Sequence, residues 1–497
     1  MARTRVGAAG SAGSLAPGDG FPQHQEEPDF EQAIANGKSY EERDDAMRVW
    51  TRMHKAVRFV TALASAAVMA GCTTSDDIVI SPDLHDRDYR TVAWEPAAAY
   101  NPNADEALVV FDSTVVFPDE AELRGQRVSM STGALVGETR FEIGQFAADN
   151  GHTAAAYNTL HDEYLVTWVG LTSTDNHIHG QRLDPSGVPI GDDDFPIGST
   201  AATSLPNALR LLYNPAHDEY LVVWRSQSGL RAQRLDGASG AGIGGEILLA
   251  SSGASAIDAT YTPGGDEYLV AWGHSRQDSA PPQQVWALRL DGATGTQLGS
   301  GAFPVSEPGT GASLVRVSFS STENRYLVMW ASGITNLEPS PELYGQFLDA
   351  ATGAEVGTND FQITSFTNPE NEEGIRAAAL AFDSLKNEFI TTFQVNDGTN
   401  APMMDRTHAE LFAQRIAAGT GANVCASPFR VSDRNATNQP LAYPYQDAMA
   451  LLAPPGASKS LAVWLAYTPI TILPGFPPFL QADYDIWGDL IANDCIG

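Results

Sequence analysis

The sequence is poor in three features that would each point to a common class of protein. It has only 3 Cys in 497 residues, too few for a scaffold held together by disulfides. It has 29 Lys and Arg against 61 Asp and Glu, and the net charge of −32 argues against binding to nucleic acid or to an anionic bilayer surface. Its most apolar segment, residues 57–70, is too short to span a bilayer as a permanent helix. Hydrophobic residues nevertheless make up 43% of the chain, which is ordinary for a globular core.

Short catalytic and ligand-binding motifs are also missing. The sequence contains no Gly-x-Ser-x-Gly, His-Glu-x-x-His, phosphate-binding loop, EF-hand loop or cysteine pair at zinc-binding spacing. Function therefore has to be sought in the architecture and in the residues that depart from it.

The N-terminal part of the sequence predicts export. Residues 1–52 are polar and acidic without a periodic pattern, so we expect a disordered leader or a start site placed too early. The segment MHKAVRFVTALASAAVMAGC (53–72) combines a basic start, a short apolar run and small residues, which is the layout of an export signal. We therefore expect the true start at Met53 or Met47, with 53–71 as the signal peptide.

The last four residues of this segment, Met69-Ala70-Gly71-Cys72, resemble a bacterial lipobox. The resemblance implies that Cys72 is lipidated and becomes the N-terminus of a mature protein, residues 72–497. Thr73 follows the cysteine where Asp would retain a lipoprotein in the inner membrane, so the resemblance favours the outer membrane, on its periplasmic side or at the cell surface. The alternative is a plain secretory signal with a chance cysteine.

An internal repeat predicts the fold of residues 72–497. Each copy contains a β-branched and aromatic run that is typical of a strand. The seven copies are DEALVVF (105–111), DEYLVTW (162–168), DEYLVVW (218–224), DEYLVAW (266–272), NRYLVMW (324–330), NEFITTF (387–393) and KSLAVWL (459–465). A small apolar strand precedes each run, a strand of the GQRLD type follows it, and a Gly-rich turn leads to a fourth strand. This arrangement predicts an all-β, seven-bladed β-propeller of four-stranded blades.

The order of the strands predicts a closed ring. Six copies have their own fourth strand, at 141–143, 195–197, 247–249, 303–305, 361–363 and 429–431, and the seventh has none. DIVIS (77–81), at the start of the mature chain, supplies the missing strand and completes the last blade. A linear β-solenoid or two stacked sandwiches are the alternatives, but neither explains this offset.

The pattern YLVVW…YGQRLD…G…FxIS resembles a repeat of exported proteins from myxobacteria and similar Gram-negative bacteria, and it covers residues 77–493. The resemblance implies a propeller and carries no general activity. LDGATGTQLG (290–299) and LDAATGAEVG (348–357) also resemble part of a quinoprotein blade. The tryptophan that should follow them is absent, so a quinone-dependent enzyme remains only as an alternative.

Residues that recur in every blade predict structure rather than chemistry, because a catalytic site needs one copy of each group. We expect the Asp-Glu pair before the YLVVW strand to solvate a turn and to pair with the Arg of the GQRLD strand. Function should lie where the repeat is broken. The connections between the second and third and between the fourth and first strands vary in length, notably at 394–410, 432–446 and 465–485. Their shared face, mainly over blades 4–7, is the predicted interaction surface.

Three groups of residues are candidates for a site. The loop aromatics are a shelf for a sugar ring or peptide, or else pack the loops together: Tyr443, Tyr445, Tyr467, Phe476, Phe479 and Tyr484. The loop charges are an acid–base pair or a Ca²⁺ site, or else are solvated: Asp405, Arg406, His408, Asp483 and Asp485. His177 and His179 place two imidazoles on one strand face, as in a transition-metal site, but no third ligand is identifiable.

Cys425 and Cys495 fall on the short-turn face of blades 6 and 7. Disulfides persist in exported proteins, so we expect a bridge between these two cysteines that holds the C-terminus against fraying.

These features predict a monomeric cell-envelope lipoprotein whose propeller is a binding or scaffolding module for a glycan or an envelope protein. We expect no nucleic-acid partner, contact with the membrane only through the lipid anchor, and no cofactor other than Ca²⁺ at the loop carboxylates. The alternatives are a propeller enzyme that acts on glycans through two carboxylates, as glycoside hydrolases do, and a purely structural envelope protein.

Overall fold

The computed structural model divides into two units, Met1–Ser75 and Asp76–Gly497. The residues that the structure describes all belong to the second unit. They are 78–81, 91–116, 119–146, 152–170, 177–202, 209–251, 254–274, 284–308, 313–332, 342–365, 375–396, 409–432, 441–442, 449–469 and 482–492. Within these segments no helix is long and apolar enough to cross a membrane.

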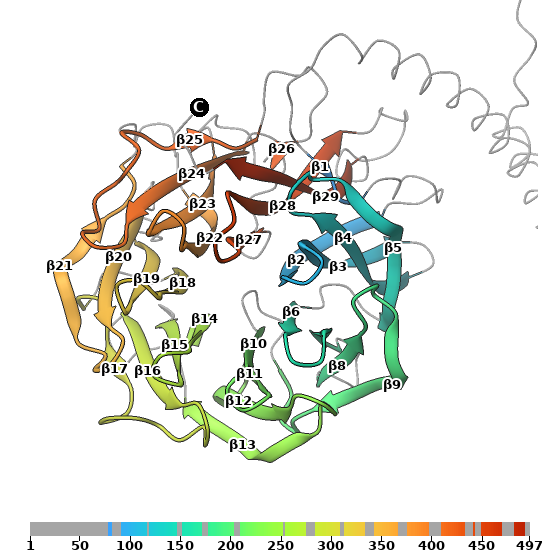
Figure 1. The fold of residues 1–497 in the computed structure, drawn as a ribbon, viewed down its shortest axis with the longest axis horizontal. Coiled ribbons are helices and arrows are strands. Elements are labelled where there is room, and N and C mark those ends of the chain that lie inside the picture. Colours follow the sequence, from blue (N-terminus) through green and yellow to red (C-terminus); the bar gives the residue numbers. More distant parts are fainter. Residues whose placement is uncertain are drawn as a thin grey trace, which may run out of the picture. The chain divides into compact units, whose positions relative to one another are not determined.

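The described residues form the predicted seven-bladed β-propeller, with its blades arranged around a central axis (Figure 1). Blade 1 consists of β2 (Thr91–Asn101), β3 (Glu106–Val116), β4 (Asp119–Ser129) and β5 (Leu135–Phe146). Blade 2 consists of β6 (Thr153–Asn158), β7 (Glu163–Val169), β8 (Ile178–Leu183) and β9 (Pro189–Ile197). Blade 3 consists of β10 (Leu209–Asn214), β11 (Glu219–Ser226), β12 (Gly229–Asp236) and β13 (Gly242–Ala250).

The remaining blades continue in the same order around the ring. Blade 4 consists of β14 (Ala254–Thr262), β15 (Glu267–His274), β16 (Val285–Asp291) and β17 (Phe303–Pro304). Blade 5 consists of β18 (Ser313–Ser320), β19 (Arg325–Ser332), β20 (Glu342–Asp349) and β21 (Glu355–Gln362). Blade 6 consists of β22 (Ile375–Asp383), β23 (Glu388–Asn396), β24 (Ala409–Ala417) and β25 (Phe429–Arg430). Blade 7 consists of β27 (Met449–Leu452), β28 (Lys459–Pro469), β29 (Ala482–Ala492) and the N-terminal β1 (Ile78–Val79), and β26 (Leu441–Ala442) lies between blades 6 and 7.

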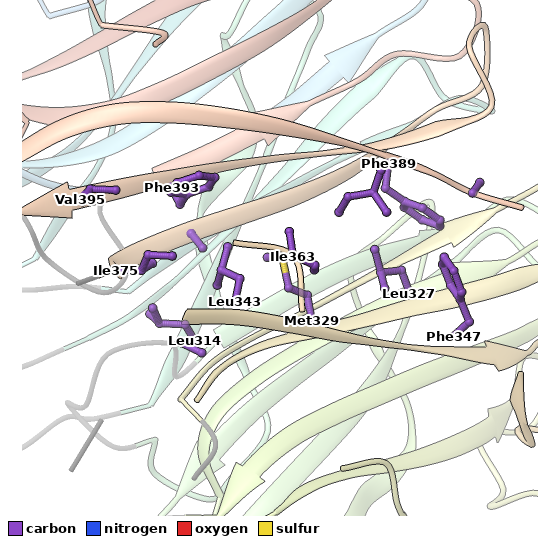
Figure 2. Packing of buried hydrophobic residues seen from close by; sticks show 14 residues of the cluster. Leu314, Leu327, Met329, Leu343, Phe347, Ile363, Ile375, Phe389, Phe393 and Val395 are labelled. Atoms are coloured by element: carbon purple, nitrogen blue, oxygen red, sulfur yellow. The ribbon is translucent and has the colours of Figure 1, made fainter. Parts of the chain in front are cut away.

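The hydrophobic core is divided among the interfaces between neighbouring blades. Seven buried clusters occur among the described residues, and each joins two adjacent blades. In the cluster between blades 5 and 6, Leu327 and Phe347 pack with Phe389 (Figure 2). The second strand of each blade packs on both faces, which is why it is a nearly continuous apolar run instead of an alternating one.

The ring closes as the strand order predicts. β1 pairs antiparallel with β29, with Ile78 opposite Gly488 and Val79 opposite Trp487. Ile80 and Ser81 are fully buried, and the Ser81 hydroxyl accepts a hydrogen bond from the Ile486 amide at 2.8 Å. The N-terminal strand therefore supplies the fourth strand of blade 7.

Blades 6, 7 and 1 form one continuous sheet, whereas blades 2–5 are separate four-stranded sheets. β26 pairs with both β24 and β28, and β2 pairs with β29 in parallel at Val92 and Tyr484. The prediction that 432–446 and 465–485 are loops throughout is therefore wrong in part. Residues 441–442 are a strand, and β28 and β29 extend as a hairpin to Pro469 and Ala482, because each finds a neighbouring strand to pair with.

The recurring Asp-Glu pair has the structural role that its repetition predicts. Asp105, Asp162, Asp218 and Asp266 end their turns in the left-handed conformation, with φ between 49° and 55°, and Asn324 and Asn387 do the same in blades 5 and 6. Asp and Asn tolerate this conformation better than other non-glycine residues. In blades 1–6 the repeat thus places a residue suited to a tight turn directly before the second strand of the blade.

The glutamate that follows pairs with the arginine of the third strand. The ion pairs are Glu106–Arg127, Glu163–Arg182, Glu219–Arg234, Glu267–Arg289 and Glu388–Arg415, with nitrogen–oxygen distances of 2.6–2.9 Å. Blade 5 carries Arg325 and Phe347 at these two positions, and the guanidinium of Arg325 lies 5.3 Å from the centre of the Phe347 ring. A cation–π contact therefore replaces the ion pair there.

The outermost strands of blades 1, 2, 3 and 5 begin earlier than the sequence predicts. The residues just after the Gly-rich turn also pair, and a register shift separates them from the predicted part. A buried glutamine bridges each shift through its side-chain amide, which donates to a backbone carbonyl of the outer strand: Gln126 to Val136, Gln181 to Ile190, Gln233 to Ile243 and Gln346 to Val356. The glutamine of the GQRLD pattern thus replaces ladder bonds that the bulge interrupts.

Candidate functional site

Several predicted site residues lie outside the described residues. These are the lipidation site Cys72, the aromatic residues Tyr443, Tyr445, Phe476 and Phe479, the loop charges Asp405, Arg406 and His408, and Cys495. Their roles remain predictions. Cys425 is described: it is buried at 4% exposure in the turn before β25, and its side chain has an interaction partner. The bridge to Cys495 also remains a prediction.

Four of the predicted loop residues lie on strands instead. Tyr467 in β28 is the direct register partner of Tyr484 in β29, and Thr468 and Ala466 are the partners of Asp483 and Asp485. The structure therefore brings the backbones of Tyr467 and Tyr484 together at the seam between blades 6, 7 and 1.

The predicted histidine pair, His177 and His179, is not part of a larger group of metal ligands among the described residues. His179 Nδ1 lies 2.6 Å from Asp194 Oδ2, and the His179 ring stacks on Trp168 with centroids 5.9 Å apart. His177 lies one residue before β8. In the described part of the chain, no group of three or more His, Cys, Asp or Glu side chains is arranged to hold a metal ion. A site at His177 and His179 would need ligands from elsewhere.

A central channel with a volume of about 670 Å³ runs between the blades. Its walls are the innermost strands of all seven blades, β2, β6, β10, β14, β18, β22 and β27. These strands begin at the face of the variable loops and end at the face of the short turns. The channel is thus a hollow to which every blade contributes.

Three charged residues break the repeat on the channel wall. They are Arg210, Asp258 and Arg316, from blades 3, 4 and 5. Each is the register partner of the residue that comes just before the tryptophan of the repeat in the second strand of its blade. They therefore stand at one level, near the variable-loop end. At the same level the other four blades carry only alanine, namely Ala97, Ala154, Ala379 and Ala450.

Asp258 of blade 4 is bonded from both neighbouring blades, by the Arg210 side chain and by the backbone next to Arg316. Arg210 Nε donates to Asp258 Oδ1 at 2.7 Å, and the backbone amide of Val317 donates to Asp258 Oδ2 at 2.8 Å. Arg316 is 6% exposed, and its Nη1 donates to the Val315 carbonyl at 2.9 Å. Both arginines also make further contacts. Asp258 thus has a partner for each oxygen, and it holds the Arg210 guanidinium through one nitrogen instead of two.

The rest of the channel is uncharged. Beyond the charged level its lining combines small and aliphatic residues, such as Ala98, Ala155 and Leu380, with the hydroxyl residues Thr260 and Ser318. Six blades place an aromatic residue at the short-turn end, and these residues are Tyr100, Tyr157, Tyr213, Tyr261, Phe319 and Phe382. A second cavity of about 600 Å³ opens there, beside the first three.

The four tyrosines at this end are fixed by the turn aspartates. Tyr213 donates to Asp218 at 3.1 Å and Tyr261 donates to Asp266 at 3.0 Å, and Tyr100 and Tyr157 bond to Asp105 and Asp162. Burial, followed by the bond to its aspartate, raises the pKa of each tyrosine. The hydroxyls therefore stay neutral donors and are unsuited to acid–base work near neutral pH.

Sequence reasoning missed the charged level in the channel. It looked for function in the long loops, whereas Arg210, Asp258 and Arg316 occur in short inner strands that were taken only as companions of the repeat. The available signal was a comparison of LRLLYN (209–214) and DATYT (258–262) with AAAYN (97–101 and 154–158), in which charge replaces alanine.

No protein-family model matches the chain, and neither does any curated protein. Solved structures with a similar fold include the β-propeller domain of the Trilobed protease from Pyrococcus furiosus, with 9% identity over 80% of this chain and 93% of that chain and a TM-score of 0.42. A polysaccharide lyase described as an ulvan lyase has 10% identity over 82% of this chain and 95% of that chain, with a TM-score of 0.49. The Dos1 propeller has 10% identity over 75% and 90%, with a TM-score of 0.40. These likenesses are of fold alone.

Proposed function

We propose that this protein is an exported, lipid-anchored protein of the cell envelope whose propeller is a binding module, with the central channel as its ligand site. The observation that carries the binding role is the charged level of the channel. Four blades have alanine at this level, and the charged residues occupy three consecutive blades. A purely structural ring gains little from an asymmetric channel of this kind.

The described channel lining favours binding over glycan hydrolysis. Glycoside hydrolases need two carboxyl groups about 5–10 Å apart across the reacting bond. Asp258 is the single carboxylate among the described lining residues, and both of its oxygens are occupied.

The envelope location rests on the segment 53–72. The lipobox-like Met69-Ala70-Gly71-Cys72 predicts lipidation, and the Cys425–Cys495 bridge would form in the oxidising space outside the inner membrane. Metabolic labelling of the full chain with a radioactive fatty acid in a Gram-negative host tests this part. We expect label in the wild type and none in Cys72→Ser; label that persists in the variant would contradict lipidation at Cys72.

Binding is tested by thermal shift on the full chain with a panel of small organic acids, neutral and acidic polysaccharides, Ca²⁺ with a chelator control, and pyrroloquinoline quinone. A ligand at 100 times its Kd stabilises the folded state by about 2.7 kcal/mol, which is readily measured. We expect the shift to disappear in Arg316→Gln and to persist in Arg231→Gln, which removes one positive charge from the Arg231–Glu246 pair outside the channel lining. A shift that survives Arg316→Gln would move the site away from the channel.

A further inference from the structure

We infer that the ligand of the channel is a small organic carboxylate with an apolar body. This inference rests on the proposed function and names the ligand class for the same site. Three observations support it: the charge of the lining, the chemistry of its donors, and the distribution of polar and apolar wall along the channel.

The charge of the lining is opposite to that of the protein. The chain carries a net charge of −32, yet the described channel lining holds two guanidinium groups and one carboxylate. A positive site between low-dielectric walls concentrates anions even on an acidic protein, because the walls focus the local field.

The donors suit a carboxylate. Arginine presents a planar fork of N–H groups that matches the two oxygens of a carboxylate, and such charge-assisted bonds are about twice as strong as neutral ones. Arg210 and Arg316 flank Asp258 from the two neighbouring blades. Asp258 fixes the Arg210 guanidinium in place through Nε, which reduces the side-chain entropy that a ligand would otherwise have to remove.

The walls beyond the charged level suit an apolar body. Among the described lining residues, no charged side chain occurs between this level and the aromatic end, where aliphatic residues such as Leu212, Leu380 and Leu452 line the channel together with the hydroxyls of Thr260 and Ser318. A volume of about 670 Å³ is in the usual range for a small-molecule site. The arrangement therefore fits a charged head at the variable-loop end and an aliphatic or aromatic body below it, and it does not fit a polymer that carries charge along its whole length.

The test compares octanoate with octanamide, which has the same body and no charge, by calorimetry and thermal shift on the full chain. We expect octanoate to bind at least ten times more tightly than octanamide, and Arg316→Gln to weaken octanoate at least tenfold while Arg231→Gln leaves it unchanged. Inorganic sulfate and acetate, which lack the body, should bind at least tenfold more weakly than octanoate.

A second variant keeps the test valid if Arg316→Gln does not fold. Ala97→Asp adds a carboxylate at the charged level without removing an existing contact, and Ala97→Asn is its uncharged control. We expect the Asp variant alone to abolish octanoate binding.

Each other outcome contradicts the inference in a distinct way. Equal binding of octanamide would show an apolar cavity without a carboxylate site, and equal binding of sulfate would show a simple anion site. If a polysaccharide binds in a manner sensitive to Arg316→Gln and octanoate does not bind, the channel is the site but its ligand class is wrong. If no probe binds, and a glycan or protein partner is captured equally well by Arg316→Gln, the proposed channel function fails as well.

Discussion

Blades 2–5 and the sheet formed by blades 6, 7 and 1 solve the same packing problem in different ways. Each of blades 2–5 is a sheet of consecutive strands that pair only with strands of the same repeat among the described residues. Blades 6, 7 and 1 are joined by pairings between their strands: β26 pairs with β24 and β28, and β2 pairs with β29. β1 also pairs with β29, far away in the sequence; the bonded residues Ser81 and Ile486 are 405 positions apart. The first region depends on local contacts, and the second on contacts between the two ends of the chain.

The comparison shows where the stability of a ring is decided. A repeat that closes its own strands can be weakened without opening its neighbours, because stability in repeat arrays is approximately a sum of local and nearest-neighbour terms. The place where the ring closes, the seam between β1 and β29, depends instead on contacts between the two ends of the described chain. Its fourth strand, β1, has only two residues, so a few contacts of Ile80 and Ser81 hold the two ends together.

The largest expected effect comes from breaking the seam. Ile80→Asp places a charge in a fully buried position beside Gly488, and we expect a loss of at least about 4 kcal/mol of unfolding free energy. Urea denaturation measures the loss, and hydrogen exchange should show the β29 amides exposed first. Val188→Asp, at a side chain 57% exposed in a turn of blade 2, is the control and should change stability by less than about 0.5 kcal/mol. Equal stability of Ile80→Asp and the wild type would mean that β1 does not hold the ring closed.

An intermediate effect is expected inside the regular blades. Arg289 pairs with Glu267 through two nitrogens and also donates to the Ala351 carbonyl of blade 5 at 2.6 Å. Arg289→Met should cost about 2–3 kcal/mol, because it leaves the largely buried Glu267 without its partner. The double variant with Glu267→Gln should recover part of this loss.

Blade 5 provides the natural comparison for this prediction. Arg325→Met removes the contact with the Phe347 ring, a hydrogen bond to the Gly419 carbonyl at 3.0 Å and a 3.5 Å ion pair with Glu323. It leaves no largely buried carboxylate unpaired, so it should cost less than Arg289→Met, about 1 kcal/mol. Urea denaturation of the two single variants and a double-mutant cycle separate the terms. Equal losses in blades 4 and 5 would show that the Glu267 ion pair contributes no more than the more exposed contacts of Arg325.

The smallest expected effect is a pH dependence of the unfolding free energy that comes from blades 2–4. His161 Nε2 lies 2.7 Å from Asp218 in the next blade, and His217 Nε2 lies 2.6 Å from Asp266 in the blade after that. Burial acts to raise the pKa of both aspartates, but hydrogen bonds from histidine, asparagine and tyrosine outweigh it, and the net effect is a lowered pKa. A carboxyl group whose pKa is lower in the folded state adds stability above its unfolded pKa, and this stability is lost as the pH falls through the folded pKa.

The corresponding variant is Asp218→Asn with Asp266→Asn. We expect it to lose stability at pH 7, by no more than about 1 kcal/mol per pair, and to show a shallower loss between about pH 4 and pH 2 than the wild type. Thermal melting across this range measures the slope. The same slope in both proteins would show that other groups dominate acid unfolding.

Most of the fold could be predicted from the sequence because the repeat expresses local physics. The run DEYLVVW combines a turn residue, an ion-pair partner and a strand buried on both faces, and each recurs at a recognisable spacing. The fourth strand of blade 7 could be predicted from the offset of DIVIS (77–81). What escaped prediction depends on contacts between distant segments: β26 is a strand only because β24 and β28 lie on either side of it. The charged level of the channel escaped for a related reason, since Arg210, Asp258 and Arg316 lie about fifty residues apart in the sequence and come to one level only when blades 3, 4 and 5 pack side by side.

The glutamine-bridged bulges in the outer strands have a consequence for the behaviour of many copies at once. An outermost strand normally offers a straight row of free amide and carbonyl groups, to which the same strand of another molecule can add. In blades 1, 2, 3 and 5 a register shift bends this row, and the glutamine of the third strand holds the bend from the inner side. Copies crowded together on one surface would therefore meet at interrupted edges that resist edge-to-edge aggregation, and the device that shapes a single blade would also keep a dense layer of molecules dispersed.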